Sequence, residues 1–196
     1  MMQASPYRDP RSEFFRGYFE RGLDYQAYLA SGEPKHRDKW LAYGDQITLE
    51  PEHETLLRTF KRQINVLVLS GIWCGDCARQ GPMLNLIEKA APAIRFRYIE
   101  NRLHPELQEE LRINGAEKVP VIVALSEDFF ELQRFGDRHL TVYRRKAEIE
   151  LGAACDPGFG GKESDLARET AAWVDHFERL ELLLRLAPML RKRYTD

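Results

Sequence analysis

Two cysteines separated by two residues are the part of this sequence best suited to chemistry. Cys74 and Cys77 lie in the segment Trp-Cys-Gly-Asp-Cys at 73–77. The apolar, β-branched run over 64–69 predicts a buried strand, after which a pattern of helical period begins. The pair therefore opens a helix, where unpaired backbone N–H groups and the helix dipole favour an anion. We expect Cys74 to ionise below the usual thiol pKa of about 8.5 and Cys77, one turn deeper, to resolve what Cys74 captures.

This spacing suits thiol–disulfide exchange, in which a thiolate attacks a disulfide and a second thiol releases the product. The alternatives are two inert thiols or half of a zinc site, and a zinc site needs two more ligands at comparable spacing. No such ligands are evident, because Cys155 stands alone and no H-x3-5-H pair occurs among His36, His53, His104, His139 and His176. The sequence favours redox chemistry with no metal and no cofactor, since both electrons reside in the two sulfurs.

The elements that must position the cysteines alternate between strands and helices. After the strand over 64–69, the hydrophobic pattern predicts helix 74–91, strand 94–100, helix 105–113, strands 120–125 and 130–135, and helix 138–150. The alternation indicates parallel pairing of the first strands, and the two adjacent final strands indicate a hairpin. The prediction is an α/β fold in the order β-α-β-α-β-β-α.

The motif and this order of elements resemble the thioredoxin superfamily. A strand, Trp-Cys-Gly-x-Cys, a helix and the later Val119-Pro120 follow the order of that family, over about residues 60–150. The longer segment 69–77, together with Gln-Gly-Pro at 80–82, is most similar to the sequences of a bacterial branch of thioredoxin-like proteins with a helical N-terminal extension. The resemblance implies a thioredoxin fold, whose mixed central sheet is flanked by helices, with extra N-terminal and C-terminal helices.

The resemblance also implies roles for residues around the cysteines. Pro120 would be cis beside Cys74, the backbone of Val119 would pair with a bound substrate, and Gly136 would lie near the active surface. Trp73 would be partly exposed and contact substrates. The alternatives are a packing role for Trp73 and a trans proline that opens a strand. The expected supporting residues are Trp73, Gly75, Asp76, Val119, Pro120 and Gly136.

Two positions depart from typical thioredoxins. Asp76 stands where they have proline, and its carboxylate opposes ionisation of Cys74, although the helix N-terminus stabilises Asp76 itself. Because a less favoured thiolate stabilises the disulfide, we expect a reducing protein. Val68 replaces the buried aspartate that accepts the proton of the resolving cysteine, so the proton of Cys77 must leave through water, Asp76 or another group. Arg79 could lower the pKa of Cys74, but a solvated helix face is the favoured interpretation.

The sequence also predicts helices in the segments outside the thioredoxin-like region. Aromatic residues recur at helical spacing over 11–31, and further helices are expected at 35–43, 51–62 and 163–187. We expect these helices to cover the core, with partner binding or dimerisation as the alternative. The predicted division is an N-terminal extension over 1–59, a thioredoxin-like domain over 60–150, and a loop with a C-terminal extension over 151–196.

The composition limits the binding partners and the cellular compartment that we expect for this protein. The chain has 196 residues, 43% hydrophobic and 31% charged, with a net charge of −2, which gives no reason to expect nucleic acid or an anionic membrane. Its N-terminus lacks the apolar stretch of a secretory signal, and no run approaches a membrane span. These features predict a cytoplasmic protein, in which a C-x-x-C pair is more often catalytic than structural. Cys155 is then an incidental thiol, or alternatively a redox sensor.

The predicted function is a cytoplasmic thiol–disulfide oxidoreductase that reduces protein disulfides through Cys74 and Cys77. Its partners would be protein or small-molecule disulfides, and a reductase or small thiol would supply electrons. The alternative is a thioredoxin-fold binding or adaptor module whose helical extensions engage a partner, with little redox turnover.

Overall fold

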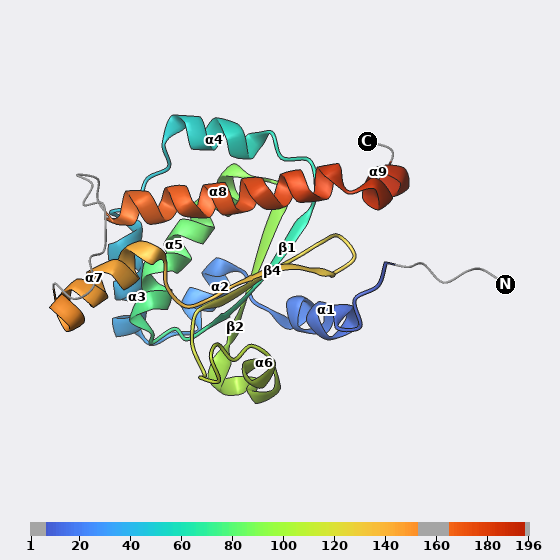
Figure 1. The fold of residues 1–196 in the computed structure, drawn as a ribbon. Helices are drawn as coiled ribbons and strands as arrows, with labels where there is room; N and C mark the ends of the chain where they lie inside the picture. Colours follow the sequence, from blue (N-terminus) through green and yellow to red (C-terminus); the bar gives the residue numbers. More distant parts are fainter. Residues whose placement is uncertain (1–6, 153–164, 195–196) are drawn as a thin grey trace.

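A four-stranded mixed sheet forms the centre of the computed structural model, which describes residues 7–152 and 165–194 (Figure 1). The strands lie in the order β2-β1-β3-β4, with β1 parallel to β2 and antiparallel to β3, and with β3 and β4 as an antiparallel hairpin. Their bounds are β1 Ile64–Ser70, β2 Ile94–Glu100, β3 Val121–Leu125 and β4 Glu131–Phe135. The α/β fold, the parallel first pair and the final hairpin are confirmed.

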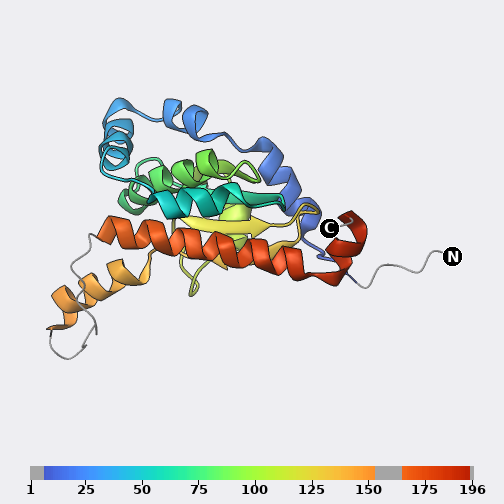
Figure 2. The ribbon, with the colours of Figure 1, turned by 90° about the horizontal axis from the view of Figure 1, so that it is seen from above.

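Helices precede, connect and follow these strands. Before β1 come α1 Ser12–Arg21, α2 Tyr25–Ala30, α3 Pro34–Gly44 and α4 Pro51–Arg58. Between and after the strands come α5 Gly75–Ala90, the 3-10 turn Asn101–Leu103, α6 Pro105–Glu110 and α7 Leu140–Leu151. Beyond residue 164, α8 Asp165–Leu186 runs along the length of the molecule and leads to α9 Pro188–Tyr194 (Figure 2).

The sheet separates two hydrophobic cores because successive side chains of a strand point to opposite faces. In β1, Val66 and Val68 belong to one core, which also holds buried residues of α2, α3, α4, α5, α8 and α9. Leu67 and Leu69 belong to the other core, which α1 and α6 complete. All of β1 is buried, as expected of a central strand covered on both faces.

The single helix expected over 11–31 is wrong, because the chain breaks between α1 and α2. Leu23 forms a β-bridge with Tyr98, with N–H to carbonyl distances of 3.0 and 2.8 Å, so the segment pairs with the edge strand β2. A side chain at Gly22 would lie 2.7 Å from Cβ of Arg97, so the close approach requires glycine there. Asp24 then caps α2 by accepting the N–H of Ala27 at 2.8 Å.

The helix α8 is amphipathic and packs lengthwise on the core. Trp173, Val174 and Phe177 are fully buried, while Leu182 and Leu186 near its end are exposed. In the two described stretches of the chain, we find no helix both long and apolar enough to cross a membrane.

A tryptophan of the N-terminal helices docks α3 onto α5 beside the two cysteines. Trp40 is fully buried, and its ring occupies the space next to Gly81, where an added Cβ would lie 1.9 Å from a ring carbon. Its indole Nε1–H donates to the carbonyl oxygen of Ile72 at 3.0 Å. The α3 helix therefore holds the loop that precedes Cys74.

We expect Gly81→Ala to lower the free energy of unfolding by about 3 kcal/mol, because overpacking of a core costs ~1–3 kcal/mol and the added methyl meets a fixed ring. The matched control is Gly17→Ala in α1, where an added Cβ would have nothing within 4 Å. Because alanine has a higher helix propensity than glycine, Gly17→Ala should raise the free energy of unfolding by up to about 1 kcal/mol. Urea unfolding measures both, and equal midpoints for the two variants would contradict this packing.

Candidate active site

The two cysteines lie where β1 passes into α5. Cys74, with extended backbone angles, is the N-cap of α5, and Cys77 lies one turn inside the helix. Cys74 is half-buried, whereas Cys77 is 1% exposed, and both are free thiols. One sulfur can therefore meet a substrate while the other cannot.

The surroundings of Cys74 stabilise its thiolate. A hydrogen bond from the Cys77 side chain, with the backbone N–H groups of Cys77 and Asp76, lowers the pKa of Cys74 to about 7, against the opposing effects of burial and of the Asp76 charge. The direction agrees with the expectation for a thiol at a helix N-terminus.

The pKa of Cys77 is shifted in the opposite direction. Burial first, and then the hydrogen bond and charge of Cys74, raise its pKa well above that of an ordinary thiol. The Gly71 N–H lies 3.4 Å from Cys77 Sγ and points to it. Neighbouring groups whose environments separate their pKa values divide naturally into a base or nucleophile and a proton-bearing partner. Near neutral pH, a large fraction of Cys74 is thiolate, whereas Cys77 keeps its proton.

The Val119–Pro120 peptide bond is cis, which confirms the expectation from the resemblance. The pairing of Leu69 with Val121 brings Pro120, which is buried, to the end of β1. Cys74 Sγ lies 3.6 Å from the Val119 carbonyl oxygen, to which the protonated thiol donates. Val119 and Pro120 therefore lie beside the half-buried sulfur of Cys74.

Trp73 is 37% exposed and lies next to Cys74 at the surface. Its ring covers Gly71, where an added Cβ would lie 2.8 Å from the indole nitrogen. The guanidinium of Arg102 stands 4.3 Å from the centre of the ring. Such a cation over an aromatic face holds the ring in place at the rim of the site.

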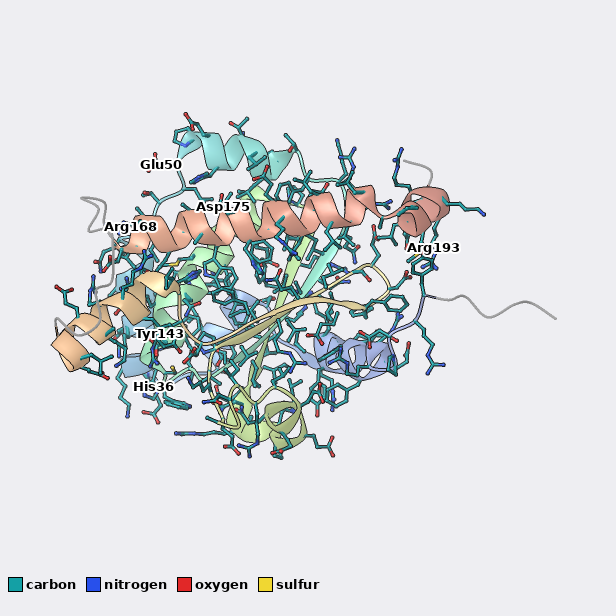
Figure 3. All side chains as sticks on the ribbon, in the orientation of Figure 1. His36, Glu50, Tyr143, Arg168, Asp175 and Arg193 are labelled. Atoms are coloured by element: carbon teal, nitrogen blue, oxygen red, sulfur yellow. The ribbon has the colours of Figure 1, made fainter. Side chains whose placement is uncertain are left out.

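A pair of charges on the other side of Cys74 was not anticipated from the sequence. The carboxylate of Asp76 forms an ion pair with Arg138 at 2.7 Å. Arg138 also lies 3.4 Å from Asp137, which accepts hydrogen bonds from Lys118 at 3.0 Å and from the Tyr143 hydroxyl at 2.6 Å. Tyr143 belongs to α7 and is labelled in Figure 3. The charge of Asp76 near Cys74 is therefore partly balanced. Residues 118 and 138 carry no local pattern that points to this role.

The two glycines expected at the site have different neighbours. An added Cβ at Gly75 would lie 3.4 Å from Lys39 Nζ, which is an ordinary contact with the end of a flexible side chain, so packing does not require glycine at this position. At Gly136 it would lie 2.6 Å from a methyl of Ile113. Gly136 follows β4 at the same end of the sheet at which Pro120 precedes β3. It therefore lies at the end of the sheet that carries the cysteines.

Two further expectations have clear outcomes. Val68 is 2% exposed in an apolar core beside Cys77, so it offers no proton acceptor. Arg79 does not lie on a solvated face, because it forms a bidentate ion pair with the fully buried carboxylate of Glu169, at 2.8 and 2.9 Å. Its charge is thus engaged away from Cys74.

Cys155 lies outside the described residues. Within residues 7–152 and 165–194, no three His, Cys, Asp or Glu side chains are arranged to hold a metal ion.

We expect iodoacetamide to alkylate Cys74 with a rate that rises through pH 7 and levels off about one unit above it, because its pKa is about 7 and only the thiolate reacts. Cys77 should stay unmodified in the folded protein, as peptide mass spectrometry would show. Cys77→Ala should move the midpoint upward, since the hydrogen bond that most favours the thiolate is lost. A rate that climbs without a plateau to pH 9 would contradict the assignment.

The ion pair beside Cys74 predicts opposite shifts for two variants. Asp76→Asn should lower the pKa of Cys74 further, because the carboxylate raises it. Arg138→Met should raise this pKa by leaving the Asp76 charge unbalanced. Absorbance of the thiolate near 240 nm follows both titrations, and shifts of the same sign would refute this electrostatic account.

The fold and the site can now be compared with known proteins. A solved protein of unknown function from Pseudomonas aeruginosa is 21% identical, with a TM-score of 0.63, and the match covers 83% of this chain and 96% of that one. An HIV epitope scaffold is 19% identical, with a TM-score of 0.64 and the same coverage. Likeness at this identity shows a shared fold.

Among curated proteins, none matches the chain. The sequence model of a family described as thioredoxin matches residues 22–146, which includes α2 to α4 as well as the sheet. This match extends over more than half of the sequence. The chain therefore belongs to the thioredoxin family.

Proposed function

We propose that this protein is a thiol–disulfide oxidoreductase that reduces protein disulfides through Cys74 and Cys77. The observation that carries the proposal is the contrast between the two sulfurs. Cys74 is accessible with a pKa of about 7, while Cys77 is buried, protonated and hydrogen-bonded to it. A nucleophile and a resolving thiol require these two states.

In the first step, the Cys74 thiolate attacks one sulfur of a substrate disulfide. A bond forms between Cys74 and that sulfur, the substrate disulfide breaks, and the leaving sulfur takes up a proton. In the second step, Cys77 loses its proton and attacks Cys74 Sγ, which releases the rest of the substrate as a thiolate that is then protonated. The substrate gains two electrons, and Cys74 and Cys77 end as a disulfide that a reductase or small thiol would reduce.

The groups around Cys74 suit an extended substrate. The Val119 backbone borders the sulfur, and Trp73 is exposed at the rim with Arg102 over its ring. A peptide with a disulfide would lie along this backbone and against the indole, which offers a large apolar surface with few internal rotations to restrict.

The moderate pKa of Cys74 favours a reducing protein. A strongly stabilised thiolate makes a dithiol an oxidant, because the reduced form is then preferred. Here burial and Asp76 oppose the stabilisation of the thiolate and leave the pKa near 7. A reducing dithiol is suited to the cytoplasm, where thiols are kept reduced.

We expect the protein to catalyse reduction of insulin by dithiothreitol, measured as turbidity of the freed chains. Cys74→Ser should abolish the activity, because no nucleophile remains. Cys77→Ser should lose turnover and accumulate a covalent adduct with the substrate, visible on a non-reducing gel, because the adduct is not resolved. Cys155→Ser serves as the matched control and should retain the wild-type rate. Equal rates for all four proteins would contradict the proposal that this protein is an oxidoreductase.

A second candidate, a binding module, is favoured by one surface. A hollow of about 380 Å³ lies where α4 meets the end of α8, and its lining includes Leu56, Phe60, Leu182 and Leu186. It is remote in sequence from the cysteines and would serve a partner without redox chemistry. Inactivity of the wild-type protein toward insulin would favour this candidate.

A further inference from the structure

Two positive side chains adjoin the residues that precede and follow Cys74. The Lys39 ammonium lies 3.4 Å from the position that a Cβ of Gly75 would take. The Arg102 guanidinium stands 4.3 Å from the centre of the Trp73 ring. Trp73 and Gly75 are bonded to Cys74, so one cation lies beside each of its chain neighbours. A disulfide that reaches Cys74 therefore brings its flanking groups near both charges.

Both cations are available to a substrate. Lys39 and Arg102 are exposed, and neither takes part in an ion pair within residues 7–152 and 165–194. Arg102 contacts the face of Trp73 instead, and a guanidinium over an aromatic ring keeps its charge and its N–H donors. Asp38 precedes Lys39 in α3, but consecutive side chains of a helix do not face each other.

The acidic side chains of the site are engaged by other groups. Their partners are Arg138 for Asp76 at 2.7 Å, Lys118 for Asp137 at 3.0 Å, and the Tyr28 hydroxyl for Glu100 at 2.8 Å. Lys39 and Arg102 therefore add positive charge at the rim that the site does not balance, although the whole chain has a net charge of −2.

Trp40 holds the part of α3 that carries Lys39. Its buried ring packs on Gly81 of α5, and its Nε1–H donates to the Ile72 carbonyl oxygen at 3.0 Å. The backbone at Lys39 is thereby held beside the first turn of α5. The N-terminal helices thus bring a charge to the site, which is a role beyond covering the core.

A thiolate attacks a disulfide flanked by carboxylates against electrostatic repulsion. The Cys74 thiolate is negative, and the charge of Asp76 acts on it with the same sign. Cations next to both chain neighbours of Cys74 offset this repulsion and attract the carboxylates. Charges at the rim of a binding surface act mainly on the rate of encounter and on the choice of partner.

We propose that Lys39 and Arg102 select protein disulfides that have aspartate or glutamate beside their cysteines. The inference rests on the proposed function, because it names the substrate class of that reaction. The substrate carboxylates would lie against the ammonium and the guanidinium while a substrate sulfur meets Cys74. The bonds that form and break are those of the proposed reaction, and neither cation transfers a proton. Lys39 and Arg102 are therefore specificity-determining residues.

Two synthetic hexapeptides test the preference. Each is closed by one disulfide, and they differ only in having aspartate or lysine beside both cysteines. The reduced protein is mixed in excess with each peptide at pH 8, samples are quenched in acid, and the reduced peptide is quantified by chromatography. The readout is the rate constant for the acidic peptide divided by that for the basic peptide. A changed thiolate fraction of Cys74 affects both peptides equally and cancels in this ratio.

We expect the wild type to reduce the acidic peptide faster. Lys39→Gln and Arg102→Gln should each lower the ratio by about threefold, which is the size of one exposed ion pair. Combining Lys39→Glu with Arg102→Glu should invert the preference. Arg102→Lys keeps the charge and should retain the ratio. In 1 M salt the preference should vanish, because the Debye length falls to about 3 Å.

The matched control is Lys89→Gln, which makes the same change in net charge in the last turn of α5. At 1.5 Å per residue, this position lies about 20 Å along the helix from Gly75. That distance exceeds the Debye length of about 10 Å at 0.1 M salt, so the ratio should be unchanged.

A small anionic disulfide distinguishes the source of the carboxylates. The same proteins are mixed with 5,5′-dithiobis(2-nitrobenzoic acid), which carries two carboxylates and no peptide. If Lys39→Gln and Arg102→Gln slow this reaction but leave the peptide ratio unchanged, the cations serve small disulfides, and the assignment to protein disulfides is overturned.

The remaining outcomes separate this proposal from the proposed function. Equal rate constants for the two peptides in the wild type, or a ratio unchanged by the double charge reversal, would overturn the selection by charge. Equal slowing of both peptides in Arg102→Gln would overturn the role of Arg102, because that is the mark of a displaced Trp73. Failure of the wild type to reduce either peptide would instead overturn the proposed function.

Discussion

The hydrogen bond between the two sulfurs is the interaction on which the site depends. It lowers the pKa of Cys74, and it adds to the larger effect of burial in raising that of Cys77, so the two sulfurs differ in their tendency to ionise. The bond requires one sulfur at the N-cap of α5 and the other one turn inside. Burial strengthens it, because a hydrogen bond in a region of low dielectric is electrostatically stronger than one in water. The central strand β1 and the two hydrophobic cores serve to hold this end of α5 in place.

The helices before β1 belong to the site as much as to the outer surface. The loop residue Ile72 is held at both of its backbone groups, since its carbonyl accepts from Trp40 at 3.0 Å and its N–H donates to Glu100 at 3.0 Å. Glu100 is in turn held by Tyr28. Two N-terminal helices thus fix the loop from which Cys74 projects. Fixed supporting side chains keep a reactive group in productive geometry.

On the opposite side, charged residues link α5 with two loops around Cys74. Asp76 of α5, Arg138 after β4 and Lys118 before Pro120 are connected through Asp137. The backbone carbonyl of Asp137 also accepts from Gln80 of α5 at 2.7 Å. Opposite charges alternate along this network, so the charge of Asp76, which raises the pKa of Cys74, is partly balanced by Arg138. The site is therefore apolar and hydroxyl-lined inside, and charged outside.

The sequence by itself determined the strands, the helix that begins at the cysteines and the order of the elements along the chain, because each is written in local periodicity or in a short motif. The resemblance to the thioredoxin superfamily added the expectation of a proline beside Cys74. Local patterns did not reveal the break at Gly22, since helical spacing persists there while the tertiary bridge from Leu23 to Tyr98 ends the helix. Nor did they reveal the contact of Tyr28 with Glu100 across 72 positions. Only the tertiary structure decided such contacts, because packing of the helices on the sheet brings these distant side chains together.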